Sequence, residues 1–465
     1  MRVLHAVPEL FPLLKVGGLA DVAAALPAAQ AAQGLDVRLL LPGLPPVLDG
    51  LADLEALPAA PGEGRLLRGR APSGLEAYVL DAPERFAAQA GPYGHPPGDP
   101  GTYRAFAAAA AVLATSGDGR GWRPDVLHLH DWPTALAASY VAREAGPRAA
   151  TVLTIHNGAY QGLFPAESFP ALGLPAEAFR PEGLEFHGLV SLLKAGLQDA
   201  DRLATVSPTY ARELRAPGGG WGLEGLYARR AGHLSGILNG VDPAAWDPAR
   251  DPALAAPVAP GDPAGRAANR AAVLDAFGLG REDGGPLFAV VSRLDPLKGL
   301  DLLLACAPPL LARGARLAVL GQGDPVLEAA FARLAEEHPG RAGWVGRTDE
   351  GLARRIFAGA DFLVVPSRAE PCGLTQLYAM RYGAVPVVRR TGGLADTVEE
   401  GPEGTGFVFD APTPEALQAA LDRAFHHFLD PPALAATRAR CMGRDHGWEA
   451  PAAAYRRLYE EIGGA

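Results

Sequence analysis

Short apolar runs alternate along the chain with longer stretches in which apolar residues recur at helical spacing. The first run, residues 2–7, leads through a glycine turn into a helical pattern over about 19–33. Strands that alternate with helices predict parallel sheets with helices on both faces. Two series of strands are predicted, over residues 2–7, 37–41, 126–130, 150–155, 202–206 and 233–238, and over residues 287–292, 316–320, 342–345, 362–366, 385–389 and 406–409.

The two series are similar in size, which predicts an α/β chain with two doubly wound domains. We place the first domain at residues 1–242 and the second at 243–447, with a final helix over 448–465. A stretch rich in proline and alanine, 243–263, is typical of a connection. Ligands of such sheets bind beyond the carboxyl ends of the strands, so motifs that follow strands carry the most information. We expect the two domains to place those motifs across one cleft.

Composition disfavours several classes of protein. The net charge is −10 and no basic run occurs, so nucleic acid is not an expected partner. No apolar stretch is long enough and free enough of breakers to span a bilayer, and residues 1–8 are typical of a strand rather than a signal peptide. The cysteines Cys306, Cys372 and Cys441 are odd in number and scattered, which disfavours a disulfide framework. We therefore expect a cytoplasmic protein.

Lysine is scarce in this chain, which favours a specific role for each lysine that occurs. Lys15, Lys194 and Lys298 are the only three among 42 basic residues. Lys15 and Lys298 adjoin glycines, and a compact cation beside open backbone N–H groups is a common way to hold phosphate. The alternative is that these are ordinary surface lysines.

The pentapeptide Gly-Gly-Leu-Ala-Asp occurs twice, at 17–21 and at 392–396. Each copy leads from a loop into a helical pattern, so each could offer backbone amides at a helix N-terminus to an anion. The alternative is a helix start that needs close backbone packing.

Histidines close two of the predicted strands. His128 and His130 share one strand face, but a metal site is disfavoured because no third ligand is suitably spaced. His156 ends the next strand beside a glycine-rich loop, which favours a ligand-binding role over quiet packing.

Two further patterns are better explained by structure than by chemistry. Asp199 and Asp201 form an Asp-x-Asp pair, yet they lie between a helical pattern and a strand, where charged helix ends are common. Gly321 and Gly323 follow a strand, but Val326 stands where the third glycine of a dinucleotide fingerprint belongs, so NAD is not expected.

The second series of strands carries the clearest candidates for phosphate chemistry. Arg293 and Lys298 follow a strand and could flank one diphosphate, whose charge grows as it leaves. Glu370 precedes a helical pattern and could act on a ligand or cap the helix. Cys372 is expected to be packed rather than nucleophilic.

Several longer motifs stand in order along the chain. They are Lys15-x-Gly-Gly-Leu, His130-Asp131-Trp132, residues 156–164, 206–211 and 237–242, the Arg293/Lys298 turn, residues 370–378 and residues 389–396. By these motifs the chain resembles a known family, the bacterial glycogen synthases and plant starch synthases. The resemblance covers almost the whole chain, and the lack of an N-terminal extension favours the bacterial type.

The resemblance implies a GT-B fold, with two Rossmann-like domains facing a cleft, and a retaining transfer of glucose from ADP-glucose to an α-1,4-glucan such as glycogen. It implies no metal and no other cofactor, and a C-terminal helix that crosses back onto the first domain. The implied catalytic residues are His156, Glu370, Asp131, Arg293 and Lys298. The implied substrate-binding residues are Lys15, Gly17, Gly18, Asn239, Gly321, Gly323, Cys372, Gly373, Leu374, Thr391, Gly392 and Gly393.

The chain departs from the family pattern in places. Val16 stands where Thr is common, Gly158 replaces a frequent Leu, and residues 45–100 look shortened, which affects any role of Tyr93. Related families carry a second Glu where this chain has Tyr378, which argues against their sucrose- and lipid-linked reactions. A glucan phosphorylase and a non-catalytic glucan- or nucleotide-binding regulator stay open as alternatives.

Overall fold

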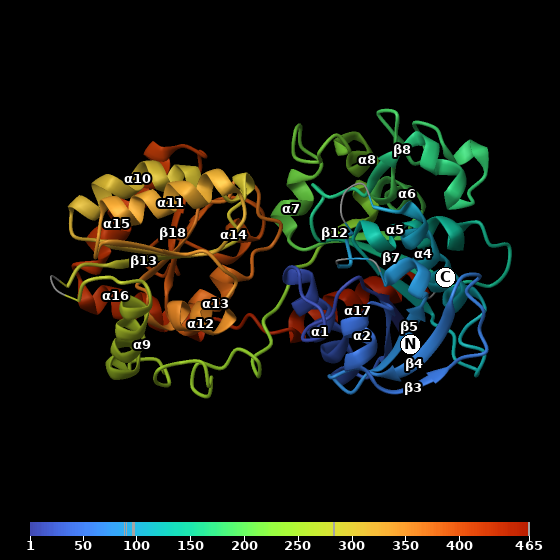
Figure 1. Cartoon of the computed structure of the whole chain (residues 1–465), viewed down its shortest axis with the longest axis horizontal. Helices are drawn as coiled ribbons and strands as arrows, with labels where there is room; N and C mark the ends of the chain where they lie inside the picture. Colours follow the sequence, from blue (N-terminus) through green and yellow to red (C-terminus); the bar gives the residue numbers. More distant parts are fainter. Residues whose placement is uncertain (88, 90, 95–97, 282–283, 464–465) are drawn as a thin grey trace. The chain divides into compact units, whose positions relative to one another are not determined.

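The computed structural model describes residues 1–87, 89, 91–94, 98–281 and 284–463 (Figure 1). By its internal contacts the chain separates into two compact units. Unit 1 comprises Met1–Gly240 together with Trp448–Ala465, and unit 2 comprises Val241–Gly447. Each unit has its own parallel sheet and its own buried core, so each is described by itself.

Unit 1 is built on a nine-stranded sheet. Its strands from β12 to β5 are parallel, and the order reverses between β1 and β6. In spatial order they are β12 (Leu234–Gly236), β11 (Arg202–Thr205), β7 (Ala150–Ile155), β6 (Val126–His130), β1 (Arg2–Ala6), β2 (Asp36–Pro42), β5 (Glu76–Asp81), β4 (Arg65–Arg70) and β3 (Ala52–Ala56). A small second sheet holds β8 (Leu163–Pro165), β10 (Leu189–Ser191) and β9 (Glu185–Phe186).

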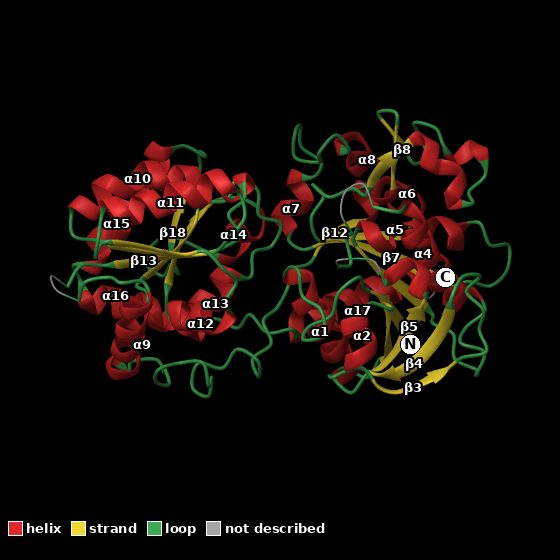
Figure 2. Ribbon diagram, in the orientation of Figure 1, coloured by secondary structure: helices red, strands yellow, loops and turns green. Residues whose placement is uncertain are grey.

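The end of this sheet differs from the parallel pattern that the sequence predicts. Strands β3, β4 and β5 pair antiparallel (Figure 2). A short turn at Gly74, whose φ is +82°, joins β4 to β5, and only antiparallel neighbours can be joined so directly. All five residues of β3 are exposed, so this strand has no apolar run to reveal it.

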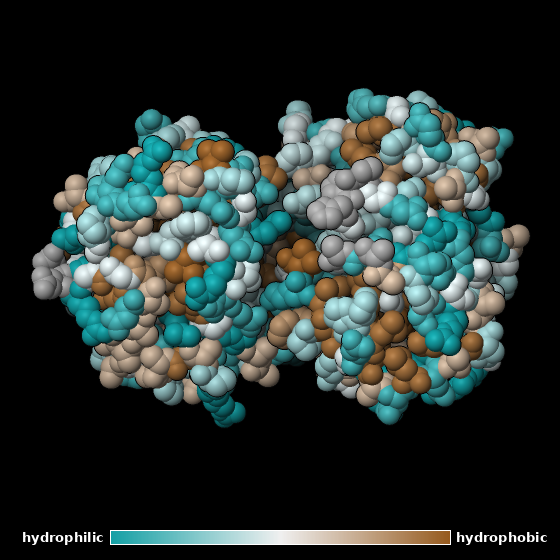
Figure 3. All heavy atoms as spheres, in the orientation of Figure 1, coloured by the Kyte–Doolittle hydropathy of each residue, from teal (hydrophilic) through white to brown (hydrophobic). Residues whose placement is uncertain are grey.

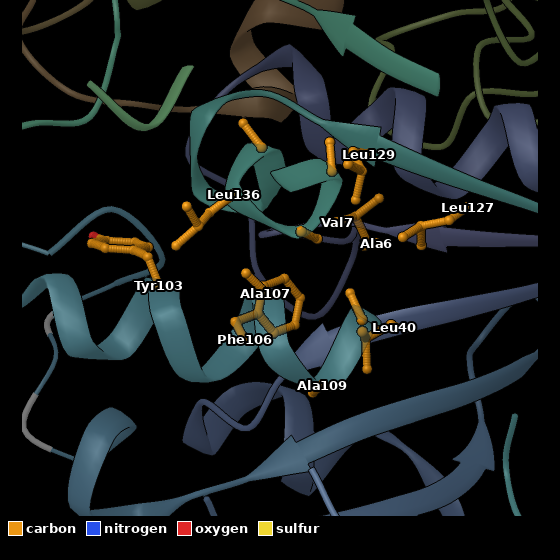
Figure 4. Packing of buried hydrophobic residues seen from close by; sticks show 14 of the residues in the cluster. Ala6, Val7, Leu40, Tyr103, Phe106, Ala107, Ala109, Leu127, Leu129 and Leu136 are labelled. Atoms are coloured by element: carbon orange, nitrogen blue, oxygen red, sulfur yellow. The ribbon is translucent and has the colours of Figure 1, made fainter. Parts of the chain in front are cut away.

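The helices of unit 1 cover both faces of its sheet. Alternate residues of each strand point to opposite faces. On one face α4 and α5 pack on β1, β2 and β6, and Figure 4 shows Phe106 and Ala107 of α4 beside Val7 and Leu40. On the other face α1 and α17 form a separate apolar cluster with Val3 and Val126. The helices are α1 (Gly18–Ala32), α2 (Pro45–Gly50), α3 (Pro83–Phe86), α4 (Pro100–Thr115), α5 (Trp132–Ala142), α6 (Leu192–Asp199), α7 (Pro208–Glu213), α8 (Glu224–Arg229) and α17 (Glu449–Gly463).

Unit 2 is a six-stranded parallel sheet whose order also reverses once, between β13 and β16. Its strands in spatial order are β15 (Ala342–Val345), β14 (Arg316–Leu320), β13 (Leu287–Val291), β16 (Phe362–Val365), β17 (Val385–Arg389) and β18 (Phe407–Phe409). Numbered along the chain this is the order 3-2-1-4-5-6 of a Rossmann fold. The predicted fold class, two doubly wound units, is confirmed.

Helices lie on both sides of the sheet of unit 2, with α10 and α11 on one side and α12 and α13 on the other (Figure 1). The helices are α9 (Pro263–Ala276), α10 (Leu300–Ala312), α11 (Pro325–Glu337), α12 (Glu350–Gly359), α13 (Thr375–Tyr382), α14 (Gly392–Thr397), α15 (Pro414–Phe428) and α16 (Pro431–Gly443). Among the described residues, none of the helices is both long enough and apolar enough to cross a membrane. On the face drawn in Figure 3, hydrophilic and hydrophobic residues are interspersed over both units.

Candidate functional site

Two of the loops that carry predicted site residues in unit 1 lie where its strand order reverses. The loop of Lys15 follows β1, and Asp131 follows the adjacent strand β6. In an open parallel sheet the connections on either side of such a reversal diverge and leave room for a ligand at the carboxyl ends of the strands. The topology therefore brings together residues that are more than a hundred positions apart in the sequence.

Asp131 holds an unusual backbone conformation. Its φ is +60° and its ψ is −177°, a region that is costly for any residue with a side chain and is often found at functional sites. Its carboxylate Oδ1 accepts hydrogen bonds from the backbone N–H groups of His156, at 2.7 Å, and Asn157, at 3.3 Å. Burial nevertheless raises the pKa of Asp131 to about 7. Asp131 thus ties the end of β6 to the loop that follows β7.

His156 is half-buried, and its ring contacts the ring of a second histidine, His130. His156 Nε2 lies 2.9 Å from His130 Nδ1, and the two rings are stacked. Desolvation lowers the pKa of His156 to about 3, so the ring is neutral at ordinary pH. A neutral imidazole offers one donor and one acceptor, which suits contact with a hydroxyl group.

Gly158, just beyond this histidine, has a packing reason for lacking a side chain. A Cβ at this position would come within 3.0–3.3 Å of Leu214 and of the hydroxyl groups of Tyr210 and Tyr227. The backbone N–H of Gly158 also donates to Tyr210 Oη at 3.0 Å. The two tyrosines fill space that a leucine at residue 158 would need.

The structure corrects the view that no third histidine accompanies His128 and His130. His5 on β1 lies beside them, and nitrogen atoms of the three rings lie within 4.8 Å of one another. Each ring nitrogen of this trio already has a hydrogen-bond partner, however, in a neighbouring ring, in Gln30, in Tyr459 or in Thr154. A metal ion would have to displace those bonds, so the trio is better described as a hydrogen-bonded cluster.

The Lys15 loop is organised by a carboxylate that the sequence motifs did not reveal. Glu9 is 1% exposed, and its Oε2 accepts from the backbone N–H groups of Val16, at 2.5 Å, and Gly17, at 3.2 Å. Its Oε1 accepts from Tyr93 Oη at 2.8 Å. Lys15 Nζ in turn lies 2.9 Å from Asp21, in the first turn of α1. The Gly17 amide would therefore have to exchange Glu9 for any bound phosphate, and Gly18 begins the helix.

Asn239 lies in the loop that follows β12, at the same end of the strands. The residue is 8% exposed, and among the described residues its Oδ1 finds no hydrogen-bond partner. A buried acceptor without a partner is uncommon in proteins and indicates that a ligand or solvent completes it.

In unit 2 the predicted residues also gather where the strand order reverses. Lys298 follows β13 and Glu370 follows the adjacent strand β16. Lys298 Nζ lies 2.6 Å from Glu370 Oε2, which also accepts from Ser367 Oγ at 2.8 Å. Glu370 is 8% exposed. The carboxylate is thus fixed by a cation and a hydroxyl rather than by capping the next helix, and Ser367 joins the site unpredicted.

Close backbone contacts explain the glycines around this pair. Gly299 has a φ of +63°, and a Cβ there would overlap the carbonyl oxygen of Pro366. Gly392 has a φ of +44°, and a Cβ would overlap the carbonyl oxygen of Glu370. The backbone N–H of Gly393 donates to that same oxygen at 3.1 Å. Thr391 is the N-cap residue of α14 and is buried.

Gly321 and Gly323 pack against the turn that carries Arg293. A Cβ on either would overlap a backbone carbonyl oxygen, that of Ser292 or that of Leu294. Asp324 then caps α11 by accepting from the backbone N–H of Val326 at 2.7 Å. These glycines are needed for the fit between two loops, and the exposed Arg293 lies on the loop they support.

The loop after Glu370 is closely packed. Cys372 is buried as a free thiol, and Gly373 has a left-handed φ of +70°. Leu374 is the N-cap residue of α13. These three residues shape the backbone between Glu370 and that helix.

Several residues that were expected to be structural are so. Asp199 accepts from Ser139 and pairs with Arg143, whereas Asp201 pairs with Arg148, so the two carboxylates serve different partners. The ring of Tyr378, for which the sequence predicts no packing role, stacks on Trp246 with centroids 3.6 Å apart, inside the core of unit 2. All three cysteines are buried free thiols.

Both units match models of known protein families. The family model described as the starch synthase catalytic domain matches residues 2–229, and that described as glycosyl transferases group 1 matches 285–427. A glycogen synthase of Rhodospirillum rubrum is 47% identical over 479 aligned residues, covering 100% of this chain and 99% of the relative. A glycogen synthase of Halorhodospira halophila is 48% identical and covers 99% of each chain.

Solved structures agree with the sequence relatives. The catalytic domain of starch synthase IV from Arabidopsis thaliana, bound to ADP and acarbose, superposes with a TM-score of 0.91 at 30% identity and covers 100% of this chain and 99% of its own. A sucrose-phosphate synthase of Thermosynechococcus elongatus, at 19% identity and a TM-score of 0.61, covers 99% of this chain and 98% of its own and shares the fold. The GT-B assignment is thereby confirmed.

Proposed function

The chain belongs to the family of glycogen and starch synthases, and on that premise we propose that it transfers glucose from ADP-glucose to the non-reducing end of an α-1,4-glucan in the cytoplasm. The observation that carries the proposal is the Lys298–Glu370 pair, fixed at the strand reversal of unit 2 in a chain that matches glycogen synthases over its full length. A glycosyltransferase needs fixed positive charge for the departing diphosphate and polar groups for the sugar. Both lie at this one point of the sheet.

Unit 2 supplies the groups that suit a nucleotide sugar. We assign the diphosphate to Lys298 and Arg293, assisted by the amides of Thr391–Gly393. Negative charge grows on the diphosphate as its bond to glucose breaks, so cations fixed beforehand stabilise the transition state more than the bound substrate. Glu370, held in one orientation by Ser367 and Lys298, is placed to accept hydrogen bonds from glucose hydroxyl groups.

Unit 1 supplies a second set of polar groups. Lys15 adds a cation on a loop that Glu9 shapes. We assign His156, Asp131 and Asn239 to the binding of the sugar. The neutral ring of His156 and the unpaired acceptor of Asn239 suit hydroxyl groups rather than phosphate.

The proposed reaction balances without a further reagent. The bond between glucose C1 and the diphosphate oxygen breaks, and a bond forms from C1 to an acceptor hydroxyl. The proton of that hydroxyl passes to the departing diphosphate. Attack on the face that the diphosphate leaves retains the anomeric configuration without an enzyme nucleophile. The cations named above hold the leaving group in place for that step.

Competition between donors tests the proposal. Glycogen is incubated with radiolabelled ADP-glucose or UDP-glucose, each with the other unlabelled sugar nucleotide as competitor. We expect label to enter glycogen chiefly from ADP-glucose. Equal use of UDP-glucose would contradict the donor assignment.

The same assay separates the alternatives. Binding of ADP without any incorporation would indicate a regulator. Release of glucose 1-phosphate from glycogen by inorganic phosphate would indicate a phosphorylase. Glu370→Gln, which keeps the size of the side chain but loses its charge, is the matched control and should bind ADP yet transfer far more slowly.

A further inference from the structure

An unbroken series of hydrogen bonds runs from His156 through the interior of unit 1 to its C-terminal helix. His156 Nε2 lies 2.9 Å from His130 Nδ1, and His130 Nε2 lies 3.0 Å from His5 Nδ1. His5 Nε2 lies 2.7 Å from Gln30 Oε1 on α1. Gln30 Nε2 then donates to Tyr459 Oη on α17 at 2.9 Å. Every member beyond His156 is completely buried, so water does not compete for these bonds.

This series follows from the alternation of side chains along neighbouring strands. His5 on β1 lies opposite His128 on β6, with His130 two residues further along the same face. That face is the one covered by α1 and α17, where Val3, Val126 and Tyr459 share an apolar cluster. Polar side chains inside such a cluster must satisfy one another.

The rings in the series are neutral, which limits how the hydrogens can be arranged. Burial lowers the pKa of His5 to about 4 and that of His130 well below its usual value. Each neutral ring has one N–H donor and one bare acceptor nitrogen. Three such rings in a row must therefore all point their N–H groups the same way along the series.

Gln30 selects the direction, because the two ends of its amide differ. Its oxygen can only accept and its nitrogen can only donate. With Oε1 facing His5, the hydrogen of His5 is on Nε2, and its Nδ1 accepts from His130 Nε2. The Nδ1 of His130 then accepts from His156 Nε2. The hydrogen of His156 is left on Nε2, and its Nδ1 is the bare acceptor.

Tyr459 anchors the far end of the series. Its hydroxyl accepts from Gln30 Nε2 and also lies 2.7 Å from His128 Nδ1, to which it can donate. His128 Nε2 is then free to donate to Thr154 Oγ1 at 2.7 Å. A reversal of the Gln30 amide would require these bonds to reverse as well, so the orientation of the amide is coupled to the hydrogen bonds of the Tyr459 branch.

We propose that Gln30, anchored by Tyr459, is a positioning residue that fixes His156 in the tautomer with its hydrogen on Nε2. His156 Nδ1 is then always available to accept a hydrogen bond. One consequence rests on the proposed function. In the enzyme with bound substrate, this nitrogen accepts a hydrogen bond from a hydroxyl of the glucosyl group. The tautomer itself is a property of the substrate-free protein.

The tautomer can be measured directly by nitrogen NMR of protein labelled with ¹⁵N-histidine. Bare and hydrogen-bearing ring nitrogens resonate in separate regions, and a His156→Gln spectrum identifies the His156 signals by subtraction. We expect Nδ1 of His156 to be bare and Nε2 to carry hydrogen. A hydrogen on Nδ1 would overturn the proposal.

Variants then test whether Gln30 is the cause. Gln30→Leu removes the amide, and Tyr459→Phe removes only the hydroxyl that orients it, so both should give mixed His156 tautomers. Gln33→Leu is the matched control, since Gln33 lies on the same segment and also bonds to the C-terminal helix, through the carbonyl of Glu449. It should leave the tautomer unchanged. If Gln30→Leu does not fold, Tyr459→Phe decides the question.

Transfer assays give an independent second reading. Loss of one neutral hydrogen bond predicts a kcat/KM about three- to tenfold lower for Gln30→Leu, a smaller loss for Tyr459→Phe and none for Gln33→Leu. If His156 keeps its single tautomer in both Gln30→Leu and Tyr459→Phe, the proposal is overturned. The NMR result needs no substrate, so a protein with the expected tautomer but no glucosyl transfer would refute the proposed function alone.

Discussion

The pentapeptide Gly-Gly-Leu-Ala-Asp begins a helix in each unit, and the two copies are held by different kinds of contact. In unit 1 the Gly17 amide donates to the side-chain carboxylate of Glu9, and Asp21 pairs with Lys15. A Cβ on Gly17 would meet nothing closer than Glu9 Oε1 at 3.9 Å. This copy is therefore governed by charged side chains that a ligand can replace.

In unit 2 the second copy is governed by the backbone. The Gly393 amide donates to the carbonyl oxygens of Glu370 and Pro371, both at 3.1 Å. Cβ atoms on Gly392 and Gly393 would overlap the backbone of residues 370–372. These contacts involve no titrating group, and they fix the position of Glu370.

One short sequence thus serves two purposes in two similar folds. The copy in unit 1 allows its loop to change partners, whereas the copy in unit 2 holds Glu370 rigidly. Substitutions should therefore act mainly through charge in the first unit and mainly through shape in the second.

The largest effect is expected at the rigid site, from Lys298→Ala. Removing a preorganised donor to a developing negative charge typically costs roughly 10²–10³ in turnover. The loss should appear in kcat more than in the affinity for ADP, because the charge on the diphosphate grows during the reaction. Steady-state kinetics and ADP titration of the same preparations check this.

Lys298→Arg tests whether a positive charge alone is sufficient at this position. Lys298 Nζ lies 2.6 Å from Glu370 Oε2, and the longer side chain and planar guanidinium of arginine cannot reproduce this compact contact. We expect only partial recovery of turnover. A Lys298→Arg enzyme with the full rate would show that charge alone matters at this position.

The next largest effect compares the two copies directly, through Gly392→Ala and Gly17→Ala. Alanine at residue 392 must adopt a left-handed φ and also displace the backbone of Glu370, at a cost of roughly 3 kcal/mol in stability. Alanine at residue 17 meets only ordinary contacts, so its effect should stay within about 1 kcal/mol. Thermal and urea unfolding of the paired variants measure both. Equal losses would mean that the two copies are held alike.

The raised pKa of Asp131 predicts that the free energy of unfolding depends on pH, and Asp131→Asn tests this. The pKa of Asp131 in the folded protein is about 7, above its ordinary value of about 3.9. Between these values the folded protein keeps a proton that the unfolded chain has released, so the free energy of unfolding falls as pH rises. Asn keeps an acceptor for the His156 amide and tolerates a positive φ, but it does not titrate.

The difference in unfolding free energy between wild type and Asp131→Asn should therefore change by about 3 kcal/mol from about pH 4 to about pH 7, in favour of the variant at higher pH. The buried histidines contribute equally to both proteins and cancel in the difference. Parallel pH dependences in the two proteins would refute the raised pKa.

The sequence was sufficient for those parts of the molecule that are specified locally. Strands β6, β7, β14, β15 and β17 have the predicted bounds, because each is a short, mostly apolar run that is largely buried. Strand β3 escaped prediction because all of its residues are exposed, and the antiparallel pairing of β3, β4 and β5 depends on turns rather than on an apolar pattern.

Long-range contacts explain what was missed in the site. His5 meets His130, 125 residues away, only because β1 and β6 are neighbours. Glu9 belongs to none of the motifs that were recognised, and its role depends on the following loop returning to its carboxylate. Its position just after a strand was the one available signal. Roles at the site can be inferred from family motifs, whereas the residues that hold those motifs in place emerge from the fold.

The smallest effect is expected from Glu9→Gln, which probes the exchangeable loop of unit 1. Glutamine keeps an oxygen to accept from the Val16 and Gly17 amides and an amide to meet Tyr93, so the loop should stay folded. It removes a negative charge that contacts the loop of Lys15, which makes the loop more attractive to a diphosphate. Because such interactions are screened, ADP should bind only about two- to threefold more tightly. Calorimetric titration of wild type, Glu9→Gln and Asp21→Asn with ADP checks this, with Asp21→Asn expected to act in the same direction. Unchanged or weaker binding in Glu9→Gln would show that Glu9 supports the loop without competing with the ligand.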